Sequence, residues 1–189
     1  MTKDPFLMLM GRPPPDVVRQ LSDIVEAAGL VQRLGRRYFD PANSHQSFSN
    51  RHKDDAVELT RMIAVGSAIQ AHAFDLSLDR IVSTVKDRID WRFESSKGRT
   101  PEFDAMLRAV RAAFDCVDGI EDEVQHAPHV TFAYGAPERL RTLHFPAVAW
   151  TVDRTELVRR MEHPYRYETL ASWPLLPASR GAVIQVPLF

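Results

Sequence analysis

One pattern occurs twice in this chain, as His45-Gln46-Ser47-Phe48 and as His129-Val130-Thr131-Phe132. Each copy places a hydroxyl residue two positions after a histidine, and only these two of the seven histidines have such a neighbour. In a strand, side chains i and i+2 point to the same face, so each copy would present an imidazole together with a hydroxyl. Two such strands facing one cleft would surround a central anion with two imidazoles and two hydroxyl donors.

The rest of the sequence predicts alternating strands and helices, with a helix before each histidine segment. Apolar runs and alternating patterns predict strands at residues 6–10, 74–78, 81–85, 91–93, 129–134, 146–152 and 156–161. Helical spacing and capping residues predict helices at residues 15–28, from 54 or 55 to about 71, and from 100 to about 119. Residues 30–43 form a polar, arginine-rich connection, and residues 165–189 are strand-like and rich in proline.

The composition is that of a folded domain with balanced charge. The 189 residues include 24 Lys plus Arg, 25 Asp plus Glu and 44% hydrophobic residues, so we expect one globular domain over residues 1–189. Proteins that grip long nucleic acids are usually distinctly basic, and a net charge of −1 argues against that class. A local site for a small phosphorylated ligand fits this balance of positive and negative charges better.

The cysteine content and the N-terminal sequence indicate in which cellular compartment the protein is expected. Cys116 is the single cysteine, which excludes an intramolecular disulfide and a cluster of thiolate ligands. The apolar run at residues 6–10 is too short for a secretory signal or a membrane span. We therefore expect a cytoplasmic protein that does not bind a membrane.

Two imidazoles and two hydroxyls suit phosphodiester chemistry without a metal. Opening a cyclic phosphate requires a base that deprotonates water and an acid that protonates the leaving ribose oxygen. Imidazole, with an ordinary pKa of about 6.5, can do either near neutrality. Ser and Thr hydroxyls can donate hydrogen bonds to phosphate oxygens as negative charge develops on them.

The sequence resembles the 2H phosphoesterases, and within them the bacterial 2'-5' RNA ligase or RNA 2',3'-cyclic phosphodiesterase group. That family is defined by two motifs of the form His, hydrophobic, Ser or Thr, hydrophobic, at the spacing found here between residues 45 and 129. The opening apolar strand followed by a helix, and the late segment 167–175 (YETLASWPL), also match. The resemblance implies an α+β fold, duplicated and two-lobed, with two antiparallel sheets flanking a central cleft and helices on the outer faces.

The resemblance also implies roles for the motif residues. His45 and His129 would be the acid and the base, and Ser47 and Thr131 would hold the phosphate. The sequence does not decide which histidine is which; our working assignment makes His129 the base and His45 the acid. The expected substrate is a 2',3'-cyclic phosphate at an RNA end or in a nucleotide, and 2'-5' ligation of RNA is a related activity. We expect no metal, no cofactor and no obligatory protein partner, and a monomer.

Two further side chains are candidates for substrate binding. Arg51 follows the first motif and would supply a cation to the phosphate, although a solvated loop arginine is the more ordinary interpretation. Tyr134 ends the second motif strand and would stack on a base or ribose, or pack as a buried strand end. The other histidines, at positions 52, 72, 126, 144 and 163, are expected at the surface or in turns.

Two positions depart from the family pattern. Gln46 stands where the family has an apolar residue, so its amide must find hydrogen-bond partners or lie at a sheet edge. The segment Ala133-Tyr134-Gly135 lacks the basic residue that members of the RNA group often carry there. These departures leave open a catalytically inactive nucleotide-binding module of the same fold. A metal-dependent hydrolase with His and Asp ligands is a separate alternative.

Overall fold

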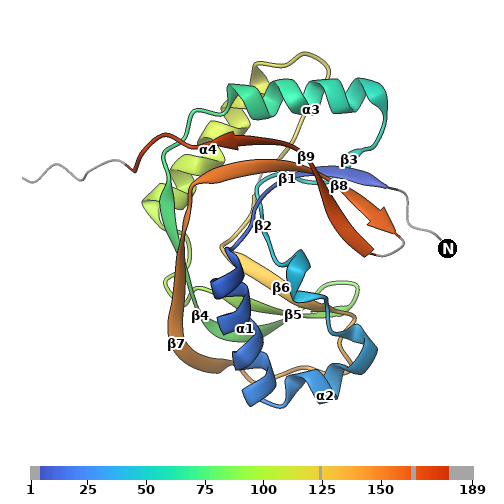
Figure 1. The fold of residues 1–189 in the computed structure, drawn as a ribbon, viewed down its shortest axis with the longest axis vertical. Helices are drawn as coiled ribbons and strands as arrows, with labels where there is room; N and C mark the ends of the chain where they lie inside the picture. Colours follow the sequence, from blue (N-terminus) through green and yellow to red (C-terminus); the bar gives the residue numbers. More distant parts are fainter. Residues whose placement is uncertain (1–4, 124, 163–164, 179–189) are drawn as a thin grey trace, which may run out of the picture.

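The computed structural model describes residues 5–123, 125–162 and 165–178, which form two antiparallel sheets around a central region (Figure 1). The first sheet has the order β2 (Gln46–Ser47), β1 (Phe6–Gly11), β8 (Arg154–Glu162), β9 (Tyr165–Pro174), and β3 (His52–Lys53) also pairs with β1. The second sheet has the order β6 (His129–Tyr134), β5 (Ile89–Glu94), β4 (Phe74–Val85), β7 (Leu143–Val152). The predicted α+β class with two antiparallel sheets is confirmed.

The helices begin where the sequence places capping residues. They are α1 (Pro15–Ala27), α2 (Leu30–Leu34), α3 (Ala56–Ala68) and α4 (Pro101–Asp115). The Asp55 side chain accepts a hydrogen bond from the Glu58 amide at the start of α3, and Thr100 accepts one from Phe103 at the start of α4. In the described part of the chain, no helix is long and apolar enough to cross a membrane.

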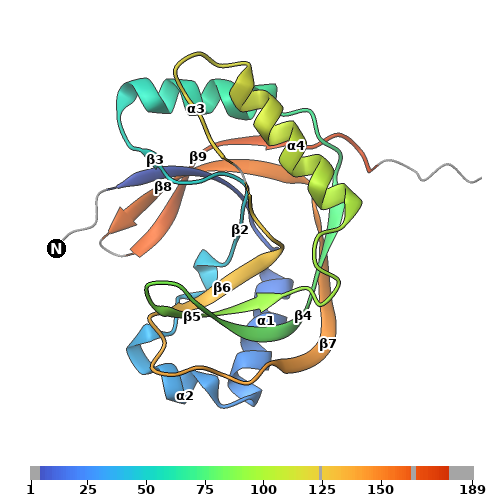
Figure 2. The same cartoon turned by 180° about the vertical axis from the view of Figure 1, so that it is seen from behind.

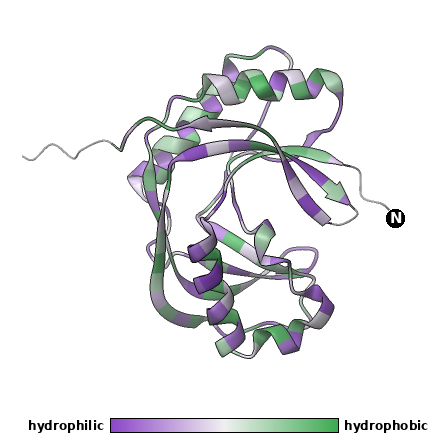
Figure 3. Ribbon diagram, in the orientation of Figure 1, coloured by the Kyte–Doolittle hydropathy of each residue, from purple (hydrophilic) through white to green (hydrophobic). Residues whose placement is uncertain are grey.

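Each lobe is covered by a helix from the chain segment that builds the other lobe. Helix α1 follows a strand of the first sheet but packs against β7 of the second sheet, and α4 lies between two strands of the second sheet but packs against α3 beside the first (Figures 1 and 2). Hydrophobic and hydrophilic residues alternate along these helices, as expected of surface helices with one buried face (Figure 3).

Strand β1 is buried on both faces: one face packs in the main core, and the other packs in a second apolar cluster beside the cleft. All six of its residues are buried; Leu7 and Leu9 belong to the large core, and Phe6, Met8 and Met10 to a second apolar cluster with Val158 and Tyr167. A strand buried on both faces has a continuous apolar sequence, which is what residues 6–10 show. The second cluster lies against the site described below.

Some predicted boundaries were wrong. Strand β4 is continuous from residue 74 to 85, with a bulge between Leu78 and Arg80, where two separate strands were expected. Between the two predicted segments, the Asp79 carboxylate accepts a hydrogen bond from the Ser96 amide (2.7 Å). The connection 30–43 contains α2 and two 3-10 turns, at Gly35–Arg37 and Pro41–Asn43. Of the strand-like segment 165–189, residues 179–189 lie outside the described residues.

Gly66 in α3 allows Trp173 of β9 to lie against the helix backbone. A Cβ atom at this position would overlap the Trp173 ring. We expect Gly66→Ala to lower the free energy of unfolding by about 1–3 kcal/mol, although Gly→Ala usually stabilises a helix. Urea unfolding measures the change. In a Trp173→Leu background the same substitution should be neutral or stabilising, and a higher stability of Gly66→Ala in the wild-type background would contradict the prediction.

Candidate active site

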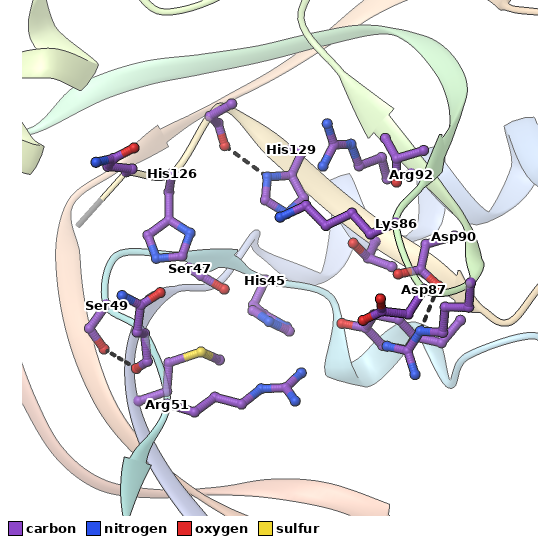
Figure 4. Close-up of a pocket in the computed structure, with 18 of the residues that line it drawn as sticks. His45, Ser47, Ser49, Arg51, Lys86, Asp87, Asp90, Arg92, His126 and His129 are labelled. Carbon is purple, nitrogen blue, oxygen red and sulfur yellow. Dashed lines mark hydrogen bonds and ion pairs between the residues drawn. The ribbon is translucent and has the colours of Figure 1, made fainter. Parts of the chain in front are cut away.

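A pocket of about 920 Å³ lies between the two sheets, and all six candidate residues predicted from the sequence line it. The first motif enters from β2 of the first sheet and the second motif from β6 of the second sheet, so the pocket joins the two lobes (Figure 4). The six residues are His45, Ser47, Arg51, His129, Thr131 and Tyr134.

The first motif is held against β1 by backbone pairing. Ser47 pairs with Met10, and the amides of Phe48 and Ser49 both donate to the Leu9 carbonyl (2.8 and 3.3 Å). Strand β2 is only two residues long, so His45 lies just before it rather than within it. The His45 ring is nevertheless buried, at 7% exposure, and meets the Tyr167 ring edge-on, with 5.0 Å between ring centroids.

The two catalytic candidates share one hydrogen-bond arrangement. His45 Nδ1 lies 2.7 Å from the carbonyl oxygen of Asn43, two residues earlier. His129 Nδ1 lies 2.8 Å from the carbonyl oxygen of Ala127, also two residues earlier (Figure 4). A carbonyl oxygen can only accept, so in both rings Nδ1 carries the hydrogen and neutral Nε2 is left with a free lone pair. Among the described residues neither Nε2 atom has a protein partner.

Burial lowers the pKa of both histidines to about 4, although the backbone carbonyls oppose the shift. The charges of His129, Arg12 and Arg51 lower the pKa of His45 further, and Arg92 acts in the same direction on His129. Both rings are therefore neutral at pH 7 in the free protein. A bound phosphate would oppose these effects because an anion favours the imidazolium form.

The two motif hydroxyls are available to a ligand. Neither the Ser47 nor the Thr131 hydroxyl makes a hydrogen bond with any residue that the structure describes. Thr131 is buried at 8% exposure, in the pocket wall. Neither hydroxyl oxygen is among the fully buried polar atoms, so both can reach a ligand in the pocket, and two such donors beside two imidazoles are consistent with an oxyanion site.

Gln46, the residue that departs from the family pattern, joins the two motifs. Its side chain is fully buried (0% exposed), and its Oε1 accepts a hydrogen bond from the His129 amide at 2.7 Å. Its Nε2 donates to the Ala127 carbonyl (3.2 Å) and to the Ser47 carbonyl (2.9 Å). The Ala127 carbonyl is also the acceptor for His129 Nδ1, so Gln46 positions the group that orients this ring.

Several pocket residues were missed by the sequence. Lys86, Arg88 and Arg92 come from the hairpin of β4 and β5, and Tyr167 from β9. Arg88 is paired with Asp90 (2.9 Å) and Arg92 with Glu94, whereas Lys86 forms no ion pair within the described ranges. The three basic residues are single charges in an ordinary strand pattern, so no sequence signal separated them from a solvated face. Tyr167 opens the segment 167–175 that carries the family resemblance, but that resemblance assigned it no role.

Two histidines expected at the surface or in turns are placed differently. His126 lines the pocket, with its Nε2 buried and without a partner. His52 is buried between Glu58 (Nδ1 to Oε1, 2.9 Å) and Asp122 (Nε2 to Oδ2, 3.0 Å). Burial lowers its pKa, but the hydrogen bonds to the two carboxylates outweigh this effect and raise it above 6.5. His72 and His144 are exposed as expected, and His163 lies outside the described residues.

No group of three His, Cys, Asp or Glu side chains within residues 5–123, 125–162 and 165–178 is arranged to hold a metal ion. The acidic residues of the pocket, Asp87 and Asp90, lie on the hairpin among the basic residues described above.

The lowered pKa of His45 predicts a pH-dependent stability. The unfolded chain binds a proton near pH 6.5 and the folded chain only near pH 4, so folding is disfavoured as pH falls through this range. Between pH 7 and pH 4, the wild type should lose about 3 kcal/mol more of its free energy of unfolding than His45→Gln, because the glutamine side chain does not titrate. Urea unfolding across this range measures the difference. Parallel curves for the two proteins would contradict the assigned pKa.

Comparison with known proteins identifies the fold. No protein-family model matches the sequence, and no curated protein sequence matches it either. LigT of Escherichia coli has a similar structure, with a TM-score of 0.71 and 17% identity over 92% of this chain and 99% of LigT. TT0787 of Thermus thermophilus has a TM-score of 0.69 and 18% identity, over 93% of this chain and 100% of that one. A structure described as a phosphoesterase has a TM-score of 0.71 and 17% identity, over 90% and 98%.

LigT is also represented by complexes with phosphate, with 3'-AMP and with ATP, which match at TM-scores of 0.68, 0.70 and 0.70. The similarity spans nearly the whole of each chain, so this protein has the fold of LigT. The fold implied by the resemblance to the 2H phosphoesterases is confirmed.

Proposed function

We propose that this protein is a metal-independent phosphodiesterase that opens 2',3'-cyclic phosphates of RNA ends or nucleotides by acid-base catalysis between His45 and His129. The observation that carries the proposal is the matched pair of imidazoles in one pocket, buried His45 and half-buried His129, each with Nδ1 bound to a backbone carbonyl and Nε2 free. General acid-base chemistry requires this arrangement, because each ring must exchange a proton with the ligand through one nitrogen.

In the proposed reaction a water molecule attacks the phosphorus while His129 Nε2 takes a proton from it. The bond between phosphorus and one ribose oxygen breaks, and His45, protonated at Nε2, transfers its proton to that oxygen. The product is a phosphomonoester with a free neighbouring hydroxyl, and the two rings end with exchanged protonation states. Solvent then restores the starting state. Attack by the 5'-hydroxyl of a second RNA in place of water, with the 3' oxygen as the leaving group protonated by His45, would give a 2'-5' linkage.

The remaining pocket groups support the same reaction. The free hydroxyls of Ser47 and Thr131 would donate hydrogen bonds to the two non-bridging oxygens, on which charge builds up during attack. Arg51 and Lys86, which form no ion pair with described residues, would attract the anion into the pocket. An anion held beside His45 would raise its pKa and so supply the imidazolium that acts as acid.

The complexes of LigT with phosphate and with 3'-AMP support a phosphate-bearing ligand for this fold. A nucleotide 3'-phosphate is one of the two products that opening a 2',3'-cyclic phosphate can give. We expect the protein to act as a monomer in the cytoplasm without an obligatory protein partner.

The proposal is tested by incubating the purified protein, in excess chelator, with the four 2',3'-cyclic nucleotides and with a short RNA that ends in a cyclic phosphate. We expect conversion of these substrates to monophosphates, which chromatography would measure. Unchanged substrates across the whole panel would overturn the proposal, and activity that disappears in chelator would favour a metal-dependent hydrolase.

One observation favours a second candidate, a nucleotide-binding module without catalysis. Both histidines have a pKa of about 4, so the free protein holds no imidazolium acid at neutral pH. Calorimetry with 3'-AMP separates the two functions. Tight binding together with no turnover of any cyclic substrate would support the binding module.

A further inference from the structure

His52 lies outside the active-site pocket, and each of its two ring nitrogens faces a carboxylate. Nδ1 lies 2.9 Å from Oε1 of Glu58 on α3, and Nε2 lies 3.0 Å from Oδ2 of Asp122, in the connection between α4 and β6. The ring is 9% exposed and stacks on Phe114 of α4, with centroids 5.3 Å apart. Ionised carboxylates only accept hydrogen bonds, so both bonds form together only when both ring nitrogens carry a proton.

The groups packed around His52 favour this protonated form. The Asp122 side chain is fully buried (0% exposed), and His52 is its ion-pair partner. Glu58 is shared, because Arg61 of α3 lies 3.6 Å from its Oε2. The other elements packed on the ring, β1 and α4, contribute the apolar residues Leu7 and Phe114. Burial lowers the pKa of His52, but the hydrogen bonds to Asp122 and Glu58 raise it above its ordinary value.

The Asp122 carboxylate also binds the stretch that follows the first motif. Its Oδ2 accepts a hydrogen bond from the Asn50 amide (2.7 Å), and its Oδ1 accepts one from Asn50 Nδ2 (2.6 Å). Together with His52, two groups of Asn50 hold a carboxylate that has no exposed side-chain surface. A buried carboxylate is stable only with such donors and with a cation beside it, and His52 supplies the cation.

The stretch after the first motif therefore binds the stretch before the second motif at two points. At one point, Gln46 binds the Ala127 carbonyl and the His129 amide. At the other, the Asp122 carboxylate is held as described above, shortly before Ala127 in the chain. Burial lowers the pKa of His126, and the charge of Asp122 opposes this effect, so the carboxylate acts on the neighbour of Ala127. The Ala127 carbonyl in turn accepts from His129 Nδ1.

We propose that protonated His52 is a positioning residue: by holding Asp122, it fixes the stretch before the second motif and thereby the Ala127 carbonyl that orients His129. The effect on catalysis rests on the proposed function, whereas the orientation of the His129 ring can be measured without a substrate. When His52 loses its proton, one ring nitrogen presents a lone pair to a carboxylate, and that hydrogen bond is lost. The hold on His129 is therefore weakened as pH rises and His52 is deprotonated.

Two-dimensional 1H–15N NMR of the histidine rings tests the inference on the wild-type protein. At about pH 6 we expect both ring nitrogens of His52 to be protonated, and His129 to carry its hydrogen on Nδ1. As pH rises, the ring signals of His129 should shift with the same midpoint as those of His52. A His52 ring that is neutral at about pH 6, or His129 signals that do not respond to its titration, would overturn the inference.

Two variants test the same link by substitution. Asp122→Asn keeps the shape of the side chain but removes the charge that His52 binds. It should shift the ring signals of His129 and lower kcat on 2',3'-cyclic AMP about tenfold, while KM changes less than about threefold. His52→Gln should have the same effect, and the double variant should be little worse than either single variant. The matched controls are Asp118→Asn, an exposed carboxylate of the same connection, and His144→Gln, an exposed histidine of β7; both should behave as the wild type.

Shifted His129 signals in both variants, with unchanged signals in both controls, would support the positioning role even if the wild type turned over no cyclic substrate. In that case the proposed function alone would fail. A loss of stability in Asp122→Asn with unchanged His129 signals and unchanged kcat would show that the cluster serves only the fold, and would overturn the inference. If a variant does not fold, as judged by circular dichroism, the wild-type titration decides.

Discussion

Replacing His45 or His129 with alanine is expected to lower kcat on a 2',3'-cyclic nucleotide by about 10³-fold, because each removes one of the two proton-transfer groups. The two rings act in one concerted step, so the double variant should be no more than a few-fold slower than either single variant. Steady-state kinetics with 2',3'-cyclic AMP gives these values. KM should change far less than kcat, because phosphate binding is assigned to other groups.

The matched control is His144→Ala, which removes an exposed histidine of β7 outside the pocket. It should retain full activity. Circular dichroism and thermal unfolding would show that all variants remain folded. Full activity in either His45→Ala or His129→Ala, with the fold intact, would rule out the two-histidine mechanism.

Replacing Gln46 with leucine is expected to lower kcat by about 10- to 100-fold, since small displacements of a catalytic group are costly. Leucine is the type of residue that the family pattern prefers, yet it leaves the His129 amide and the Ser47 carbonyl without the partners that Gln46 supplies. Stability should fall by about 2 kcal/mol, as expected for unsatisfied buried polar groups. Steady-state kinetics and urea unfolding measure the two effects.

Gln70→Leu, at an exposed position after α3, is the control for the exchange of glutamine for leucine. If Gln46 positions His129, kcat should fall in Gln46→Leu while KM changes less than about threefold, and the limbs of the pH profile should shift. A loss of stability with unchanged kcat and pH profile would instead show that Gln46 serves only the fold.

The resemblance carried by the two motifs implied the fold class, and the motifs themselves nominated residues that share a pocket. This worked because strand patterning is local: His129 and Thr131 lie two apart on β6, and both line the pocket. The first motif differs in detail, since a 3-10 turn at Pro41–Asn43, rather than a strand, carries the chain to His45. The catalytic and binding roles of these residues remain predictions.

The parts that sequence reasoning missed depend on contacts between distant residues. His52 has the sequence context of a loop histidine until Asp122, 70 positions later, is brought against it. The groove beside the active-site pocket is built in the same way, because Arg36 and Arg160, which both line it, lie far apart in the sequence. No local pattern encodes such convergence, and an arginine-rich connection is by default a solvated loop.

The exchange of helices between the lobes has a consequence for how the cleft keeps its shape. A fragment of residues 74–152 would retain β4 to β7 but lose α1, leaving the apolar surface of β7 in water, and the remainder of the chain would lose α4. Each lobe therefore relies on a helix that comes from the other part of the chain. One motif histidine lies on each lobe, so the cleft between them depends on helix packing that involves both parts of the chain.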